Sequence, residues 1–161
     1  MSICMKKYWM KCTFVFLLSF VLLNACTQIE LFEKNTLIPN LKWQNNFDAT
    51  GTFNITDTSS LYNVFIVLRH TDAYQYNNIW LNVALQASGD SVNMQKINLS
   101  LGSDAQGWEG IGMNDIWEVR KLIARVPLKK GDYNFSIGQI MRDNPLQHIM
   151  SVGLRLKKAE E

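Results

Sequence analysis

Short hydrophobic segments recur along the chain from residue 30 onwards, and most of them alternate apolar with polar residues. Alternation with a period of two is typical of β-strands that turn one face towards a core. Clusters of glycine, asparagine, aspartate and serine separate the segments and favour turns. The pattern predicts strands at Glu30–Ile38, Thr52–Thr56, Tyr62–Arg69, Ile79–Ala87, Val92–Leu101, Val119–Leu128, Tyr133–Met141 and Ile149–Leu156.

Three of these segments carry more specific signals. Tyr62–Arg69 is nearly continuous in β-branched, aromatic and other apolar residues, as in a central strand that is buried on both faces. Ser88–Asp90 predicts a hairpin turn between Ile79–Ala87 and Val92–Leu101. The alternation in Val92–Leu101 changes phase at Ile97, and such a change is typical of a β-bulge.

The remaining pattern favours an all-β fold. Val119–Leu128 could form a short helix, but Pro127 and its β-branched residues favour a strand. Tyr133–Met141 alternates strictly and follows a tight turn at Lys129–Asp132. Seven or eight strands with short connections predict a single antiparallel β-sandwich over residues 31–161, with an open barrel as the alternative.

The first 26 residues do not fit the strand pattern. Lys6, Lys7 and Lys11 precede or flank the start of an apolar run at Thr13–Leu23, which ends in Leu-Asn-Ala-Cys at positions 23–26. A cationic start, a short apolar run and a small residue at the cut predict a secretory signal peptide. Because the residue after the cut is Cys26, we predict a bacterial lipoprotein with a lipid on this thiol.

This interpretation divides the chain into a signal peptide at 1–25, a lipidated amino terminus with a short linker at 26–30, and the β-domain. Thr13–Leu23 is shorter than the roughly 20 apolar residues that a spanning helix needs. The alternatives are an uncleaved membrane helix and an ordinary secretory signal in which Cys26 merely lies near the cut. Two or more acyl chains anchor a protein stably, so the membrane itself is a predicted partner.

Processing changes the composition of the mature chain. Cys4 and Cys12 leave with the signal peptide and Cys26 is lipidated, so no free thiol or disulfide remains. Removal of Lys6, Lys7 and Lys11 from the 16 basic residues leaves 13 against 14 acidic residues. No basic stripe remains that would indicate nucleic-acid binding.

The sequence contains little that indicates catalysis. His70 and His148 are the two histidines, too few and too far apart for a metal site, so we expect ordinary surface or turn residues. No Gly-x-Ser-x-Gly motif is present. Two acid pairs could do glycosidase work, but we expect solvated carboxylates in loops. These pairs are Asp115 with Glu118 and Asp104 with Glu109. The residues predict no cofactor and no enzyme activity.

Exposed aromatic residues are the better candidates for a binding site. Gly102–Glu118 lacks periodicity, and loops of this length are often functional. Trp108 could present a flat face to a sugar ring or a protein, or it could fold back with Trp117 over an open end of the sandwich. Tyr74 and Tyr76 form a second possible platform or a packed pair. The partner- or ligand-binding candidates are Trp108, Tyr74, Tyr76 and Arg142.

Several strand-like motifs also occur in a fixed order along nearly the whole mature chain. They are Leu37, Pro39 and Trp43, then Tyr62–Arg69, Asp72–Trp80, Gly107–Gly112, Asp132–Arg142, Leu146, Ile149 and Val152–Arg155. In this order they resemble the gliding motility-associated lipoprotein family GldH. The resemblance implies an envelope lipoprotein of Bacteroidota-type bacteria with a role in gliding and in the linked secretion apparatus. It implies no catalytic residue and one site, the lipid-bearing Cys26.

Three functional hypotheses follow. The first is a non-enzymatic, lipid-anchored protein that docks onto other envelope proteins of a motility or secretion assembly. The second is a carbohydrate-binding lipoprotein of a glycan-uptake system, and the third, based on the loop acids alone, is an enzyme. We expect the protein at the outer membrane, on its periplasmic face.

Overall fold

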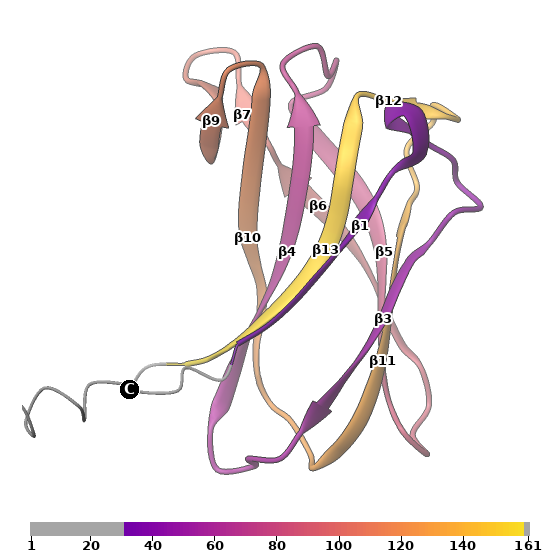
Figure 1. The fold of residues 1–161 in the computed structure, drawn as a ribbon, viewed down its shortest axis with the longest axis vertical. Helices are drawn as coiled ribbons and strands as arrows, with labels where there is room; N and C mark the ends of the chain where they lie inside the picture. The colour runs from indigo at the N-terminus through magenta and orange to yellow at the C-terminus, as the bar shows by residue number, and fades with distance from the viewer. Residues whose placement is uncertain (1–30, 160–161) are drawn as a thin grey trace, which may run out of the picture.

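A computed structural model describes residues 31–159, which form antiparallel β-strands and one short 3₁₀ helix (Figure 1). The predicted signal peptide, the linker at 26–30 and Cys26 lie outside the described residues. The elements are β1 (Leu31–Leu37), the helix η1 (Pro39–Leu41), β2 (Lys42–Trp43), β3 (Ala49–Ile55), β4 (Leu61–Thr71), β5 (Asn78–Ala87), β6 (Asn93–Ser100), β7 (Gly102–Ser103), β8 (Gly107–Trp108), β9 (Ile111–Met113), β10 (Ile116–Pro127), β11 (Gly131–Gln139), β12 (Leu146–Gln147) and β13 (Ile149–Lys158). No helix within residues 31–159 has the length and hydrophobicity that crossing a bilayer requires.

The strands form two main sheets and two small ones. The five-stranded sheet has the order β1-β13-β4-β10-β9, and the four-stranded sheet has the order β3-β11-β5-β6. The small sheets pair β12 with β2 and β7 with β8. Every strand pair is antiparallel, which confirms the all-β prediction.

The predicted count of seven or eight strands is wrong, since the described residues contain 13. Each of the eight predicted segments overlaps one long strand. The additional strands β2, β7, β8, β9 and β12 are two or three residues long. Alternation needs several residues to become visible, so such short strands leave no periodic signal.

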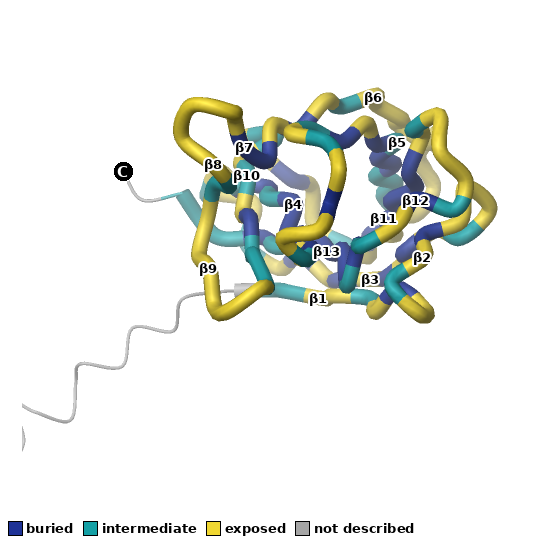
Figure 2. The backbone as a smooth tube through the Cα atoms, turned by 90° about the horizontal axis from the view of Figure 1, so that it is seen from above, coloured by how far each residue is buried: buried dark blue, intermediate teal, exposed yellow. Residues whose placement is uncertain are grey.

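The two main sheets enclose one hydrophobic core. Phe32 of β1 contacts Phe53 of β3 across the layers, with ring centroids 5.2 Å apart. Phe53 in turn stacks on Tyr133 of β11. Figure 2 shows buried segments of both sheets turned inwards and exposed loops around the periphery. With no disulfide among the described residues to stabilise the fold, burial of this apolar surface is its main source of stability.

The central position of β4 confirms one specific prediction. Ile66, Val67 and Leu68 are consecutive and almost completely buried, so both faces of the strand are covered. β4 lies between β13 and β10, and its register runs from Tyr62 to His70 against β13.

The predicted bulge in the Val92–Leu101 segment is wrong. β6 pairs with β5 without a register shift, from Asn78 opposite Ser100 to Leu85 opposite Asn93. The hairpin turn at Ser88–Asp90 is present, with the Asp90 amide donating to the Ala87 carbonyl. Val92 and Met94 are exposed while Leu99 is buried. The change of phase therefore arises because apolar residues lie on the outer face of this edge strand. It does not arise from the extra residue of a β-bulge.

The expectation of an irregular loop over Gly102–Glu118 is also corrected. The segment forms the β7–β8 hairpin and β9, and β10 already begins at Ile116. β10 is a strand, as Pro127 and the β-branched residues favoured, and its register shifts between Leu122 and Ala124. β7 and β9 lie towards the upper end of the molecule in Figure 1, where β9 forms the edge of the five-stranded sheet beside β10.

Candidate functional surfaces

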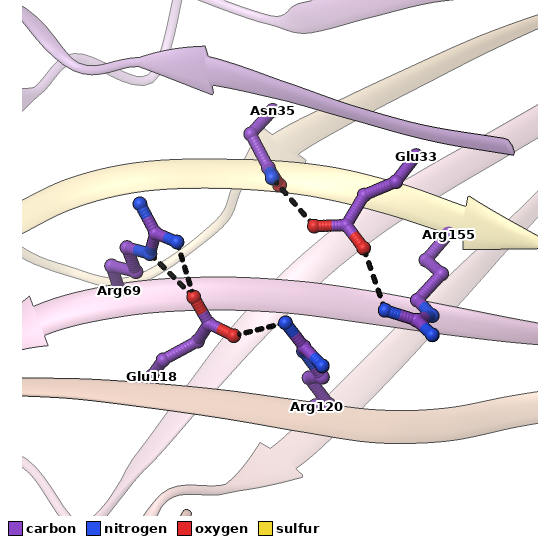
Figure 3. Close-up of polar contacts among 6 residues, drawn as sticks. All are labelled: Glu33, Asn35, Arg69, Glu118, Arg120 and Arg155. Carbon is purple, nitrogen blue, oxygen red and sulfur yellow. Dashed lines mark hydrogen bonds and ion pairs between the residues drawn. The ribbon is translucent and has the colours of Figure 1, made fainter. Parts of the chain in front are cut away.

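The outer face of the five-stranded sheet carries a network of charged side chains (Figure 3). Directly opposed residues of an antiparallel pair share a face, and Arg69 of β4 is opposite Glu118 of β10. Arg69 Nε donates to Glu118 Oε2 at 2.6 Å, and Arg120 binds the other carboxylate oxygen at 2.7 Å. Glu118 is thus held by two guanidinium groups while its side chain is 14% exposed.

A second carboxylate on the same face has a perturbed acidity. Glu33 of β1 accepts hydrogen bonds from Arg155 of β13 and from Asn35, each at 2.9 Å. Partial burial of Glu33 opposes its ionisation, but these hydrogen bonds and the charges of Arg120 and Arg155 outweigh it. The pKa of Glu33 therefore lies below its usual value.

Exposed apolar residues surround this charged network. Their registers place five large hydrophobic side chains on the same outer face as Arg69 and Glu118. These are Leu37 (77% exposed), Leu61 (42%), Ile111 (67%), Met113 (73%) and Leu122 (54%). A sheet face that combines arginines with uncovered apolar side chains has the composition of a protein-binding surface.

Two of the four acids singled out from the sequence, Glu109 and Glu118, form ion pairs, whereas Asp104 and Asp115 are exposed turn residues. Glu118 lies on β10, and Glu109 pairs with Lys121 and accepts a hydrogen bond from Ser100 Oγ at 2.7 Å. These contacts lower the pKa of Glu109, the Lys121 hydrogen bond most of all. The expectation of a solvated carboxylate in a loop is therefore wrong for Glu118, which lies on β10 and is 14% exposed, whereas Glu109 does lie in a loop, with its side chain 41% exposed. A glycosidase acid needs a raised pKa, whereas the pKa of Glu109 is lowered.

His70 also departs from its expected place. It is completely buried in β4, and its Nδ1 lies 2.8 Å from the Thr71 carbonyl. Burial lowers the pKa of His70. Its ring contacts Trp108 with centroids 4.6 Å apart. The expectation of a surface or turn histidine is wrong for His70, although His148 does lie in the turn before β13.

Two of the three aromatic candidates, Trp108 and Tyr74, pack against the ring of His70. Trp108 lies on β8 and is half-buried against His70 and Tyr74, in keeping with the packed alternative. Tyr74 is 3% exposed and donates its hydroxyl to the Asn78 carbonyl at 3.0 Å. Burial raises the pKa of Tyr74.

Tyr76 and Arg142 lie together at a depression beside the upper end of β5. Tyr76 donates its hydroxyl to Asp143 at 2.5 Å, and this hydrogen bond raises the pKa of Tyr76. The depression measures about 550 Å³. It is lined by Tyr76, Asn78, Trp80, Ile140, Met141, Arg142 and Asp143. Sequence reasoning missed Trp80, although the buried alternation of Ile79, Leu81 and Val83 already implied that its side chain points outwards.

Within residues 31–159 no three His, Cys, Asp or Glu side chains gather in a way that could hold a metal ion. The molecule is thus an all-β protein whose distinctive side-chain chemistry lies on its two sheet surfaces. Its family follows from comparison with known proteins. The family model for the GldH lipoprotein matches residues 30–156, and the chain belongs to this family.

Two relatives are similar over almost their whole length. The gliding motility lipoprotein GldH homolog of Christiangramia forsetii is 25% identical, covering 91% of this chain and 95% of the relative. The gliding motility lipoprotein GldH of Flavobacterium johnsoniae is also 25% identical, covering 91% and 96%. Among solved structures, the infectious bursal disease virus VP2 subviral particle covers 81% of this chain and 33% of its own, with 11% identity. Its TM-score of 0.36 is too low to support an inference.

Proposed function

We propose that this protein is a non-enzymatic, lipid-anchored component of the cell envelope that docks a protein partner of a gliding or linked secretion apparatus. Membership of the GldH lipoprotein family and the names of both relatives support a lipid-anchored protein with a role in gliding motility. The observation that carries the docking role is the outer face of the five-stranded sheet, where uncovered apolar side chains surround an arginine–glutamate network.

The chemistry of this face indicates the kind of partner. Its strands contribute five basic side chains and two acidic ones, an excess that favours an acidic partner surface. They are Arg69, Arg120, Arg125, Arg155 and Lys157 against Glu33 and Glu118. Leu122, Ile111 and Met113 would supply apolar contact area near the edge at β9.

The predicted lipid anchor at Cys26 lies close to the start of β1 along the chain. Four residues separate Cys26 from Leu31 at the start of β1, and the five Cα–Cα steps between them span at most about 18 Å. β1 begins at the side of the lower half of the molecule in Figure 1, and the β7, β9 and β12 region lies at the upper end. A lipid on Cys26 would thus hold the lower half, rather than the upper end, near the bilayer. We place the protein at the outer membrane, facing the periplasm.

Site-directed photo-crosslinking in intact cells tests the docking role. A photoreactive amino acid at Leu122 is expected to capture a specific envelope protein, and Leu122→Asp is expected to abolish co-purification of that protein. Met94 is the matched control, because it is similarly exposed but lies on the other sheet. Equal capture from both positions, or an unchanged Leu122→Asp complex, would contradict the proposed face.

The anchor has a separate test. Cys26→Ser is expected to release the protein from the envelope fraction, and mass spectrometry of the parent protein is expected to find acyl groups on Cys26. A Cys26→Ser protein that still sediments with membranes would exclude the lipid as its attachment. Protease treatment of intact cells distinguishes a periplasmic from a surface location.

A further inference from the structure

The outer face of the four-stranded sheet differs chemically from that of the five-stranded sheet. Its four strands present mostly amide and hydroxyl side chains, with Lys96 and Asp132 as their charged residues. The face consists of Thr50, Thr52, Asn54, Asn78, Trp80, Asn82, Ala84, Gln86, Met94, Lys96, Asn98, Ser100, Asp132, Asn134, Ser136 and Gly138. Asp48, just before β3, adds a carboxylate beside Ser136 and Gly138, and Lys34 lines a depression on this face. Basic and acidic side chains are therefore equal in number, in contrast to the excess of basic residues on the opposite face.

From this face we infer a second binding site, which takes a neutral oligosaccharide or polysaccharide. Sugar hydroxyls both donate and accept hydrogen bonds, and the side-chain amides of Asn and Gln offer both functions as well. The weakly polar C–H face of a pyranose ring packs on aromatic side chains. Trp80, which is 43% exposed, provides such a surface near the start of β5, between Asn78 and Asn82 on the same face.

The backbone holds Trp80 in place. Its carbonyl accepts a hydrogen bond from the Ile140 amide at 3.0 Å, and its own amide donates to the Met141 sulfur at 3.2 Å. Both backbone groups of Trp80 are thus bonded to the segment after β11, and on its other side Trp80 is opposite Asn98 of β6. A fixed backbone at Trp80 reduces the conformational entropy that is lost when a ligand stacks on its ring.

Polar groups converge on the depression beside Trp80. Asn78 donates its amide to Asn98 at 2.8 Å, which orients both side chains. Asp143 accepts the Tyr76 hydroxyl and lies across the depression with Arg142. Arg142 is exposed, and among the described residues its side chain makes no ion pair or hydrogen bond. It is therefore available to a sugar hydroxyl.

A second depression of about 520 Å³ continues the site along the same face. It crosses all four strands where Ala84 has a short side chain, and Thr52, Gln86, Asn134 and Met94 are among its lining residues. Ala84 follows Trp80 by four positions, roughly 13 Å along the strand. This separation suits a chain of several sugar units better than a single monosaccharide.

The site does not depend on the proposed docking role. It lies on the other sheet, and the depression beside Trp80 is near the upper ends of β5 and β11, away from the start of β1 (Figure 1). A protein could bind a partner on one face and a glycan on the other at the same time. The two proposals can fail separately.

Affinity electrophoresis and calorimetry with the full chain in mild detergent test this inference. The probes are neutral cellohexaose, laminarihexaose, mannohexaose and xylohexaose, with the anionic hexamer of galacturonic acid for comparison. At least one neutral hexamer is expected to bind. Trp80→Ala is expected to weaken that binding roughly tenfold, which corresponds to loss of one aromatic stacking contact. Trp80→Phe is expected to recover part of it.

Met113→Ala is the matched control, because Met113 is exposed on the other sheet and should leave sugar binding unchanged. Circular dichroism confirms that each variant is folded. Gln86→Ala, in the second depression, is expected to weaken hexamer binding more than disaccharide binding. Absence of binding to every neutral hexamer, preference for the anionic hexamer, or a folded Trp80→Ala protein with parental affinity would each overturn the inference.

Discussion

His70 and Trp108 pack edge to face, with ring centroids 4.6 Å apart and ring planes at 65°. His70 lies inside the central strand β4, whereas Trp108 belongs to the small β7–β8 hairpin at the upper end of the molecule. The contact therefore joins a glycine-rich peripheral segment to the core. It explains why this segment is ordered although its own strands are only two residues long.

Replacing Trp108 should measure how much the hairpin contributes to stability. Complete burial of a tryptophan would make its loss cost about 3–5 kcal/mol. Because Trp108 is only half-buried, we expect Trp108→Ala to lower the free energy of unfolding by about 2 kcal/mol. Trp108→Phe should cost less than half as much, since it retains a ring against His70. Urea denaturation measures both variants, and parental stability in Trp108→Ala would contradict the packed arrangement.

Acidification should destabilise the protein through His70. Burial lowers its folded-state pKa below the unfolded value, so the unfolded chain binds a proton that the folded chain does not. The part of the unfolding free energy that depends on a neutral His70 is fully present above about pH 6.5. It is lost as the pH falls towards the lowered pKa of the folded state. Urea titrations between about pH 7.5 and 5 should show the free energy of unfolding decreasing, by about 1.4 kcal/mol for each unit of pKa shift.

The two histidines provide a matched pair for this measurement. His70→Gln removes the titrating group and should flatten the pH dependence of the unfolding free energy above pH 5, whatever its effect on absolute stability. His148→Gln replaces the partly exposed histidine and is the control for the loss of an imidazole elsewhere in the chain. If His70→Gln retains the parental slope, the pH dependence arises elsewhere.

Much of the fold could be predicted because its long strands alternate, and the errors have physical causes. The Tyr62–Arg69 segment was recognised from local composition. Its inward phase of Tyr62, Val64, Ile66 and Leu68 continues to His70, so extending the strand by one residue would have predicted the buried histidine. The outward position of Trp80 was likewise present in the alternation of β5.

The surfaces were harder to predict, because their residues come together through strand order and register. Arg69 and Glu118 are neighbours only because β4 pairs with β10 in one particular register. A single sequence contains the alternation of each strand but not which strand lies beside it. For the same reason, the depression between Trp80 on β5 and Arg142 after β11 could not be inferred from spacing.

The Glu118 network should contribute modest, salt-sensitive stability. Glu118 is largely buried by two arginines, so we expect Glu118→Gln to lower the free energy of unfolding by about 1 kcal/mol at low salt. The loss should shrink in about 1 M NaCl, where charges are screened within a few ångströms. Asp90→Asn breaks the exposed Lys129–Asp90 pair and should change stability by less than about 0.5 kcal/mol at either salt concentration. Equal effects of the two substitutions would show that burial of Glu118 does not increase the contribution of its ion pairs to the free energy of unfolding.

Two glycines of the segment before β10 should respond differently to alanine. Both have positive φ angles, +73° at Gly107 and +94° at Gly110, so a side chain costs about 1–2 kcal/mol at either position. A Cβ atom at Gly107 would meet nothing nearby, whereas at Gly110 it would collide with the Glu118 carbonyl oxygen.

This carbonyl belongs to β10, directly beside the arginine network, so backbone rather than a flexible side chain would have to move. We therefore expect Gly110→Ala to lower the free energy of unfolding by about 3 kcal/mol or more and Gly107→Ala by about 1 kcal/mol. Parallel urea titrations measure the difference. Similar losses at both positions would show that Gly110 does not pack against β10, because backbone strain alone would then account for both.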